Sequence, residues 1–83
     1  MELTILSPHS VRFRGPALSR MARGALSAAS ISVIDRQPAA DWGGQLQHYV
    51  VSVEARDDED AIVRVQGAIG LHGAYSGFTP DSR

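Results

Sequence analysis

The 83-residue sequence contains no cysteine, no lysine and no asparagine. Without cysteine, the protein can form no disulfide bond, no thiolate metal site and no cysteine nucleophile. Every lysine or arginine position is an arginine, eight in all. Because the codons of lysine and asparagine are rich in A and T, their joint absence is typical of a high-GC genome. We therefore expect an accessory protein of a high-GC bacterium or of a bacteriophage.

The sequence also lacks a long apolar run. No stretch approaches the ~18 residues that a membrane-spanning helix requires, and the N-terminus lacks the basic-then-apolar pattern of a secretory signal. We therefore expect a cytoplasmic protein that does not contact membranes. With 43% hydrophobic and 20% charged residues, the composition is that of an ordinary globular protein. The length predicts one domain over 1–83, with 80–83 as a flexible tail.

Few stabilising devices are available to so short a chain. A single core of this size supplies only ~3–5 kcal/mol net, and small domains often make up the deficit by oligomerising. Charge is unevenly divided, since residues 1–36 carry five arginines and two acids, whereas residues 37–83 carry three arginines and seven acids. The two halves could attract each other head to tail or pair internally. We predict a homo-oligomer, most simply a dimer.

The hydrophobic period changes twice from two residues to three or four. Residues 46–56 alternate apolar and polar side chains, which predicts a strand. The acidic residues 57–60 suit a helix N-terminus, and apolar residues then recur at helical spacing. A similar order occurs nearer the N-terminus. The predicted elements are strands over 1–7, 31–36, 46–56 and 74–79, helices over 16–29 and 58–70, and a loop over 8–15.

This β-α-β-β-α-β order resembles the ferredoxin-like fold. The resemblance implies an α+β two-layer sandwich, in which a four-stranded antiparallel sheet of spatial order 4-1-3-2 carries two helices on one face. It covers nearly the whole chain and depends on element order alone. Because this fold hosts many unrelated activities, it implies no function for this chain.

The segment from His9 to Gly15, between the first predicted strand and helix, is a candidate anion-binding loop. Two arginines, Arg12 and Arg14, and the N-terminus of a helix opened by Pro16 favour phosphate or carboxylate. Acylphosphatases share the fold and bind phosphate with an arginine in this loop. Their mechanism also needs an asparagine to position water, and this chain has none. The alternative is a solvated loop with Phe13 against the core.

Four arginines near the N-terminus offer a nucleic-acid-binding alternative, because clustered arginines bind phosphates. They are Arg12, Arg14, Arg20 and Arg23. Proteins with an RNA recognition motif share the fold and stack bases on aromatic side chains of the central strands. The matching positions of the third predicted strand carry His48, Val50, Ser52 and Glu54. This face has no phenylalanine or tyrosine, and the glutamate repels phosphate.

The three histidines, His9, His48 and His72, are too dispersed to form a metal motif. A general base could arise if folding brought one of them near Asp35 or Glu54. We predict no metal site, no cofactor and no catalytic residue. The remaining enzymatic alternative is a small dimeric α+β barrel with a histidine in the pocket between sheet and helices.

Trp42, in a predicted glycine-flanked hairpin loop, is a candidate partner contact, because tryptophan is enriched at binding hot spots. Apolar side chains on the uncovered face of the sheet would mark a second interface. The residues expected there are Val50, Leu6, Ile34 and Tyr75. The leading hypothesis is a small non-enzymatic interaction module, which forms a symmetric homodimer or docks on a host protein. Its predicted contacts are Trp42, His48 and Val50, with Arg12 and Arg14 attracting acidic partners.

Overall fold

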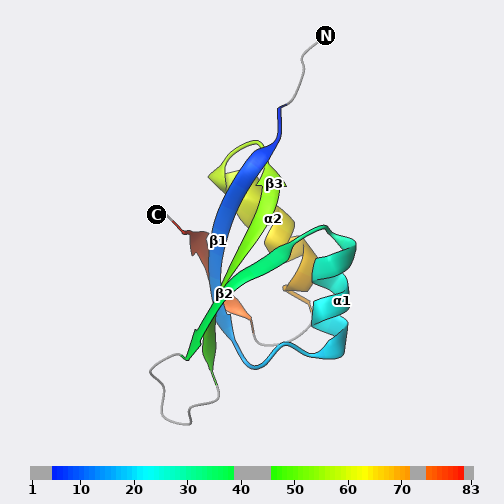
Figure 1. The fold of residues 1–83 in the computed structure, drawn as a ribbon, viewed down its shortest axis with the longest axis vertical. Coiled ribbons are helices and arrows are strands. Elements are labelled where there is room, and N and C mark those ends of the chain that lie inside the picture. Colours follow the sequence, from blue (N-terminus) through cyan, green and yellow to red (C-terminus); the bar gives the residue numbers. More distant parts are fainter. Residues whose placement is uncertain (1–4, 39–45, 72–74, 82–83) are drawn as a thin grey trace.

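The structure, a computed structural model, describes residues 5–38, 46–71 and 75–81. Trp42 and His72 lie outside these ranges. Six elements follow one another in the predicted β-α-β-β-α-β order (Figure 1). They are β1 (Ser7–Gly15), α1 (Arg20–Ala28), β2 (Ser32–Pro38), β3 (Gln47–Ala55), α2 (Asp58–Ile69) and β4 (Ser76–Pro80). Neither helix among the described residues is long and apolar enough to cross a membrane.

The four strands form one antiparallel sheet in the order β2-β3-β1-β4. This confirms the spatial order 4-1-3-2 predicted from the ferredoxin-like resemblance. β3 and β1 pair along their whole lengths, from Ser7 opposite Ala55 to Gly15 opposite Gln47. β3 therefore occupies the central position that its apolar content predicts, and β2 and β4 form the two edges.

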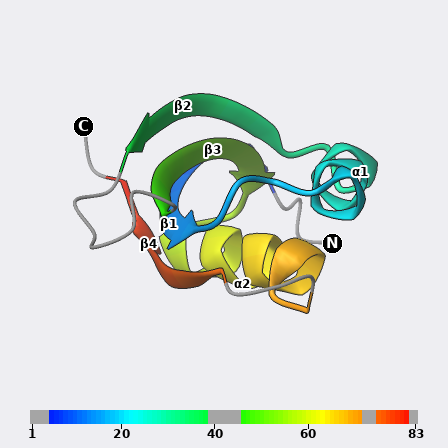
Figure 2. The same cartoon turned by 90° about the horizontal axis from the view of Figure 1, so that it is seen from below.

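The two helices lie on the same side of the sheet, and they cover it unequally. α2 packs against β1, β3 and β4, whereas α1 packs mainly against α2 (Figure 2). α2 buries Ala61, Val65 and Ile69 against the sheet. Because α1 packs against α2, the side of β2 that faces the helices is only partly covered.

Phe13 of β1 is at the centre of the core and has no exposed surface. Its ring stacks on Tyr49 at a centroid distance of 5.2 Å and on Phe78 at 5.4 Å. Tyr75 meets the same ring edge-on at 5.9 Å. Aromatic pairs at such distances stabilise by about 0.5–1.5 kcal/mol beyond the burial of their area, so β1, β3 and β4 are joined through one residue.

The predicted position of the first strand was wrong. β1 spans Ser7–Gly15 rather than 1–7, and the segment expected to be a loop is therefore a strand. Val11 and Phe13 are buried while Arg12 and Arg14 are exposed, which is the alternation of a strand with one face on the core. Pro8 is tolerated because β4 pairs with β1 only from Val11 onward, so Pro8 has a ladder partner on one side alone.

The predicted start of the first helix was also wrong. α1 begins at Arg20, and the hydroxyl of Ser19 caps it by accepting the Ala22 N–H at 3.1 Å. Ala22 and Leu26 are buried as predicted, whereas Met21 is 71% exposed. Pro16 instead lies in the segment that crosses from β1 to α1. Arg12 and Arg14 therefore lie in β1 rather than in a loop that leads directly into the N-terminus of α1.

The acidic start of α2 matches the prediction. Asp57 is the N-cap, and its carboxylate accepts the Asp60 N–H at 2.8 Å. Asp60 in turn accepts the Arg56 N–H at 3.0 Å, so the two aspartates bond to backbone groups on both sides of the helix start. This reciprocal arrangement resembles a capping box.

The first residue after β4 is also bonded to β1. The Asp81 N–H donates a hydrogen bond to the Ser10 carbonyl at 2.9 Å.

Candidate functional site

The face of the sheet away from the helices carries two rows of side chains in register. Arg12 of β1 lies opposite Val50 of β3, and Val50 lies opposite Asp35 of β2. The next row is Arg14, His48 and Gln37. A hollow of about 130 Å³ lies among Arg12, Asp35, Gln37, His48 and Val50. The structure therefore brings together Arg12, His48 and Val50, with Arg14 beside them, while the fifth predicted contact, Trp42, lies outside the described residues.

This open face is polar rather than apolar. Val50 is only 4% exposed, so it offers little surface to a partner. The Arg12 guanidinium lies 3.4 Å from the Asp81 carboxylate. Tyr75 belongs to the core on the helix side, and Ile34 lines a hollow together with Tyr49 on that side as well. Of the four residues expected in an apolar patch here, Val50 and Tyr75 are buried and Ile34 lines the other side of the sheet, while Leu6 is 42% exposed.

The four arginines of the nucleic-acid alternative belong to two separate surfaces. Arg12 and Arg14 project from β1 between buried neighbours, hence away from the helices. Arg20 and Arg23 are on α1. The described outward positions of β1 and β3 carry no phenylalanine, tyrosine or tryptophan on which a base could stack, and His48 is the one aromatic ring among them.

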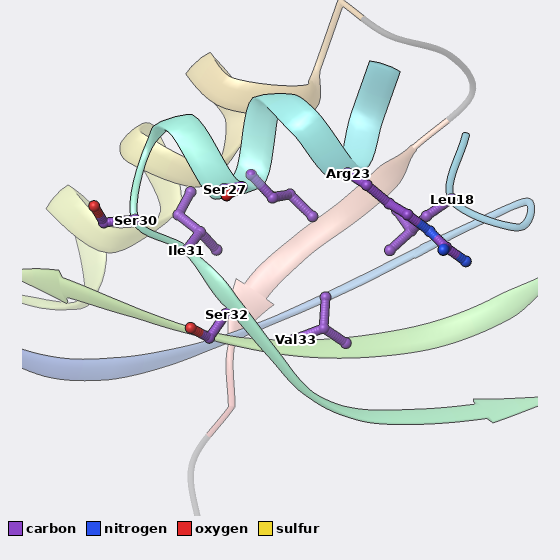
Figure 3. A pocket seen from close by; sticks show the side chains of 8 residues that line it. Leu18, Arg23, Ser27, Ser30, Ile31, Ser32 and Val33 are labelled. Atoms are coloured by element: carbon purple, nitrogen blue, oxygen red, sulfur yellow. The ribbon is translucent and has the colours of Figure 1, made fainter. Parts of the chain in front are cut away.

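A larger depression lies between α1 and β2, and we name it the α1–β2 groove. It consists of two hollows of about 320 and 410 Å³ that share Leu18, Arg23 and Val33. Figure 3 shows side chains that line the first of them. α1 and the segment before it form one wall, β2 forms the other, and the buried ring of Tyr49 lies at its base. The complete lining is Leu18, Arg23, Leu26, Ser27, Ser30, Ile31, Ser32, Val33, Ile34, Asp35, Arg36 and Tyr49.

Two aliphatic side chains of β2 are left exposed in this groove. Val33 is 42% and Ile34 is 51% exposed. Val33 lies opposite the buried Val51, whereas Asp35 lies opposite Val50, so Ile34 is the extra residue of a β-bulge. The bulge turns both aliphatic residues toward the helix side, where α1 would cover them if it packed on β2.

Two cations, Arg23 from α1 and Arg36 from β2, line the same groove. Neither guanidinium forms an ion pair with another residue in the described ranges. Burial raises the pKa of Tyr49 above its ordinary value, while the positive charges of Arg36 and Arg23 act in the opposite direction. Both charges are therefore close enough to the base of the groove to act on its phenol.

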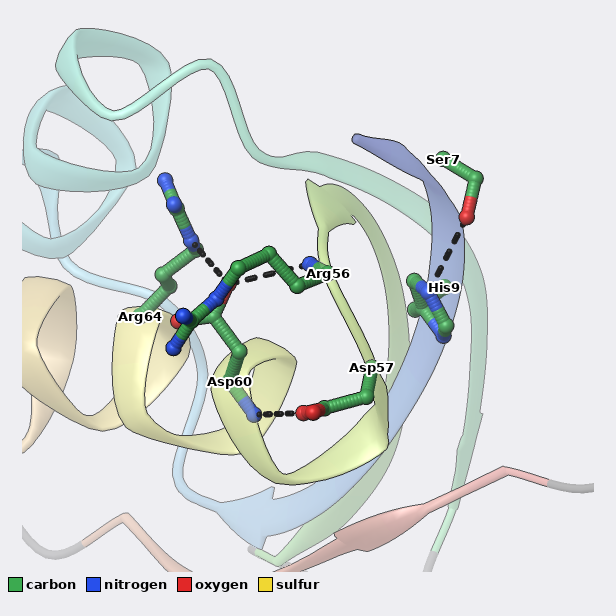
Figure 4. Close-up of polar contacts among 6 residues, drawn as sticks. All are labelled: Ser7, His9, Arg56, Asp57, Asp60 and Arg64. Atoms are coloured by element: carbon green, nitrogen blue, oxygen red, sulfur yellow. Dashed lines mark hydrogen bonds and ion pairs between the residues drawn. The ribbon is translucent and has the colours of Figure 1, made fainter. Parts of the chain in front are cut away.

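Ser7, His9 and Asp58 form a hydrogen-bonded chain in the order of a catalytic triad (Figure 4 shows its first link). Ser7 Oγ and His9 Nε2 lie 3.2 Å apart, and His9 Nδ1 and Asp58 Oδ1 lie 3.1 Å apart. A working triad also needs oxyanion donors and a substrate cleft. Ser7 and His9 line none of the hollows above, and the Asp58 side chain is 61% exposed. We assign these two hydrogen bonds a structural role, because they join the start of β1 to the first turn of α2.

The sequence analysis missed the groove and its residues Leu18, Val33 and Arg36. The one usable indication was the Val33-Ile34 pair, which interrupts the alternation expected of an edge strand. Comparison of the chain with models of protein families, with curated proteins and with solved structures finds no match. Within the described ranges, no group of three or more histidine, aspartate or glutamate side chains is placed to hold a metal ion.

Proposed function

We propose that this protein is a small interaction module without an enzymatic role, and that it binds a partner protein through the α1–β2 groove. The proposal is carried by one observation, namely that exposed aliphatic side chains line the same groove as two arginines that form no ion pair with the described residues. Val33 and Ile34 supply the apolar surface, and Arg23 and Arg36 supply the charge. The open face, where Arg12 and Val50 are already engaged in the fold, is the weaker candidate.

The chemistry of the groove defines its partner. Full burial of a valine or isoleucine is worth about 1.5–3 kcal/mol, so roughly half of that gain remains unused at each of Val33 and Ile34. Arginines in a partly apolar surface select carboxylates, with which they form bidentate pairs. The partner is thus a protein segment that carries aliphatic side chains next to aspartate or glutamate.

Selection of a random peptide library against the immobilised protein tests this proposal. We expect enriched peptides that combine aliphatic and acidic residues. They should lose binding when the protein carries Arg23→Glu and Ile34→Ser, two changes at exposed or partly exposed groove positions. Arg14→Glu is the matched control, because it makes the same charge reversal on the open face. Peptides that depend on Arg14 and ignore the groove variant would refute the assignment of the site.

A further inference from the structure

A second exposed apolar surface runs along the outer side of α2. Glu59, Val63, Gly67 and Leu71 follow one another at steps of four, so they share one side of the helix and of its C-terminal extension. Val63 is 60% and Leu71 is 93% exposed. A side chain added at Gly67 would meet no atom within 4 Å. We name this surface, made by these four residues, the α2 ridge.

The α2 ridge and the α1–β2 groove are complementary in shape and in charge. The groove is hollow and is lined by two arginines and one aspartate, whereas the ridge is a convex helix that begins with three acids, Asp58, Glu59 and Asp60. Asp60 is bound by Arg56 and Arg64. Glu59 forms no ion pair with another described residue and stands one helical turn before Val63. The ridge therefore offers an aliphatic side chain next to a carboxylate, which is the chemistry that the groove selects.

The two surfaces cannot meet within one molecule. β2, one wall of the groove, and α2 lie on opposite sides of the view in Figure 2, with the central strands between them. A contact between ridge and groove must therefore join two copies. It would use different surfaces of each copy, so a pair of molecules keeps one free groove and one free ridge.

We infer that the groove binds the α2 ridge of a second copy of this chain, in head-to-tail fashion. This inference rests on the proposed function, because it names the partner of the same groove. The mode is that of an amphipathic helix laid in an apolar groove. Arg23 and Arg36 of one copy face the acidic start of α2 in the next. Such a heterologous contact repeats into a ring or an open chain rather than stopping at a symmetric dimer.

Two variants and their mixture test the inference. The groove variant Arg23→Glu/Arg36→Glu presents negative charge to Glu59, and the ridge variant Val63→Arg presents positive charge to the groove arginines. Both alter exposed side chains, and far-UV circular dichroism checks that each variant folds. Sedimentation equilibrium measures the average mass of the wild type, of each variant, of Arg14→Glu as control, and of the two variants mixed in equal amounts.

We expect the wild type and Arg14→Glu to grow in average mass with concentration, and each groove or ridge variant to associate at least ~10-fold more weakly. The mixture should restore association, because the intact groove of the ridge variant then meets the intact ridge of the groove variant. Added salt should weaken association, since the charges are near the surface.

Three results would overturn the inference. One is a wild type that remains monomeric up to ~1 mM, the concentration at which a contact of about 4 kcal/mol is half formed. Another is a symmetric dimer that neither variant disturbs, as the open-face homodimer predicted from the sequence would be. A third is a mixture that fails to restore association. In the first two cases, peptides selected against the groove could still bind, so the proposed function is judged separately.

Discussion

The hydroxyl of Tyr49 donates a hydrogen bond to the carbonyl oxygen of Pro16 at 3.1 Å, and so ties the central strand to the segment that leads into α1. Tyr75 donates to the neighbouring carbonyl of Ala17 at the longer distance of 3.4 Å. Through these two bonds the core holds the crossing segment on which the position of α1, and therefore the width of the α1–β2 groove, depends.

Replacing Tyr49 by phenylalanine should lower the free energy of unfolding by about 1 kcal/mol, because it removes one buried hydrogen bond and leaves the Pro16 carbonyl unsatisfied. Tyr75→Phe is the matched control, and its longer bond predicts a smaller loss. Urea denaturation of the two variants measures both effects. A Tyr75 variant that loses more stability than the Tyr49 variant would contradict the role given to Tyr49.

Stability should fall at alkaline pH, and Tyr49 should contribute to the fall. Burial raises the pKa of Tyr49 in the folded protein, whereas in the unfolded chain it titrates near its ordinary value of about 10. Above that pH the unfolded chain releases the proton first, so unfolding becomes more favourable as pH rises through the folded pKa. Unfolding midpoints from pH 8 upward should decline less steeply in Tyr49→Phe than in the wild type. Parallel declines would show that Tyr49 is not responsible.

The acid side of the stability curve should depend on Asp60. Hydrogen bonds from the Arg56 N–H and then from the Arg64 side chain lower its pKa (Figure 4). The stability that the carboxylate contributes is thus fully present above its unfolded pKa of about 3.9, and it is lost as pH falls through the folded value. Asp60→Asn should be less stable than the wild type at neutral pH, and the difference should shrink in acid.

The control for Asp60 is its neighbour Glu59, which makes no hydrogen bond or ion pair with another described residue. Glu59→Gln removes the same charge from the same helical turn. Its stability should follow the wild-type pH profile more closely than that of Asp60→Asn. If both variants changed the stability at acidic pH by the same amount, the cause would be the net charge at the start of α2 and not the hydrogen bonds of Asp60.

The sequence predicts the second half of the fold better than the first, for a physical reason. In β3 and α2 the change of side-chain period coincides with an N-cap, Asp57, so local pattern and local chemistry agree. In β1 the alternation from Val11 to Arg14 is present, but Pro8 suggested an earlier end. Pro8 is tolerated because the pairing of β4 with β1 does not extend as far as Pro8. This pairing is between residues far apart in the sequence, so no local pattern predicts it.

The groove lies beyond local prediction for a similar reason. A run such as Val33-Ile34 in a strand is typical of burial on both faces, yet both residues are exposed. Their exposure depends on the packing of α1 against α2 and on the β-bulge at Ile34. Arg12 lies beside His48 and Val50 through strand register, which the sequence did not reveal because Arg12 was predicted to lie in a loop.

Gly15 should tolerate no side chain. A Cβ there would overlap the ring of Tyr75 and would lie 3.2 Å from its Cα, and Tyr75 is held in the core. Gly15→Ala should therefore cost about 1–3 kcal/mol of stability through overpacking. Gly24, in the middle of α1, has open space around it, so Gly24→Ala should stabilise by about 0.4–1 kcal/mol. Thermal unfolding of both variants checks the contrast, and equal effects would disprove it.

The same substitution at two isoleucines separates the core from the groove. Ile69 has no exposed surface, so Ile69→Ala should lower stability by about 2–5 kcal/mol. Ile34 is half exposed on the bulge, so Ile34→Ala should change stability by less than about 1 kcal/mol while weakening binding to the groove. Denaturation combined with a binding measurement on each variant distinguishes the two roles. If Ile34→Ala instead destabilised the protein as much as Ile69→Ala, α1 would have to cover β2 in solution, and no groove would exist there for a partner to occupy.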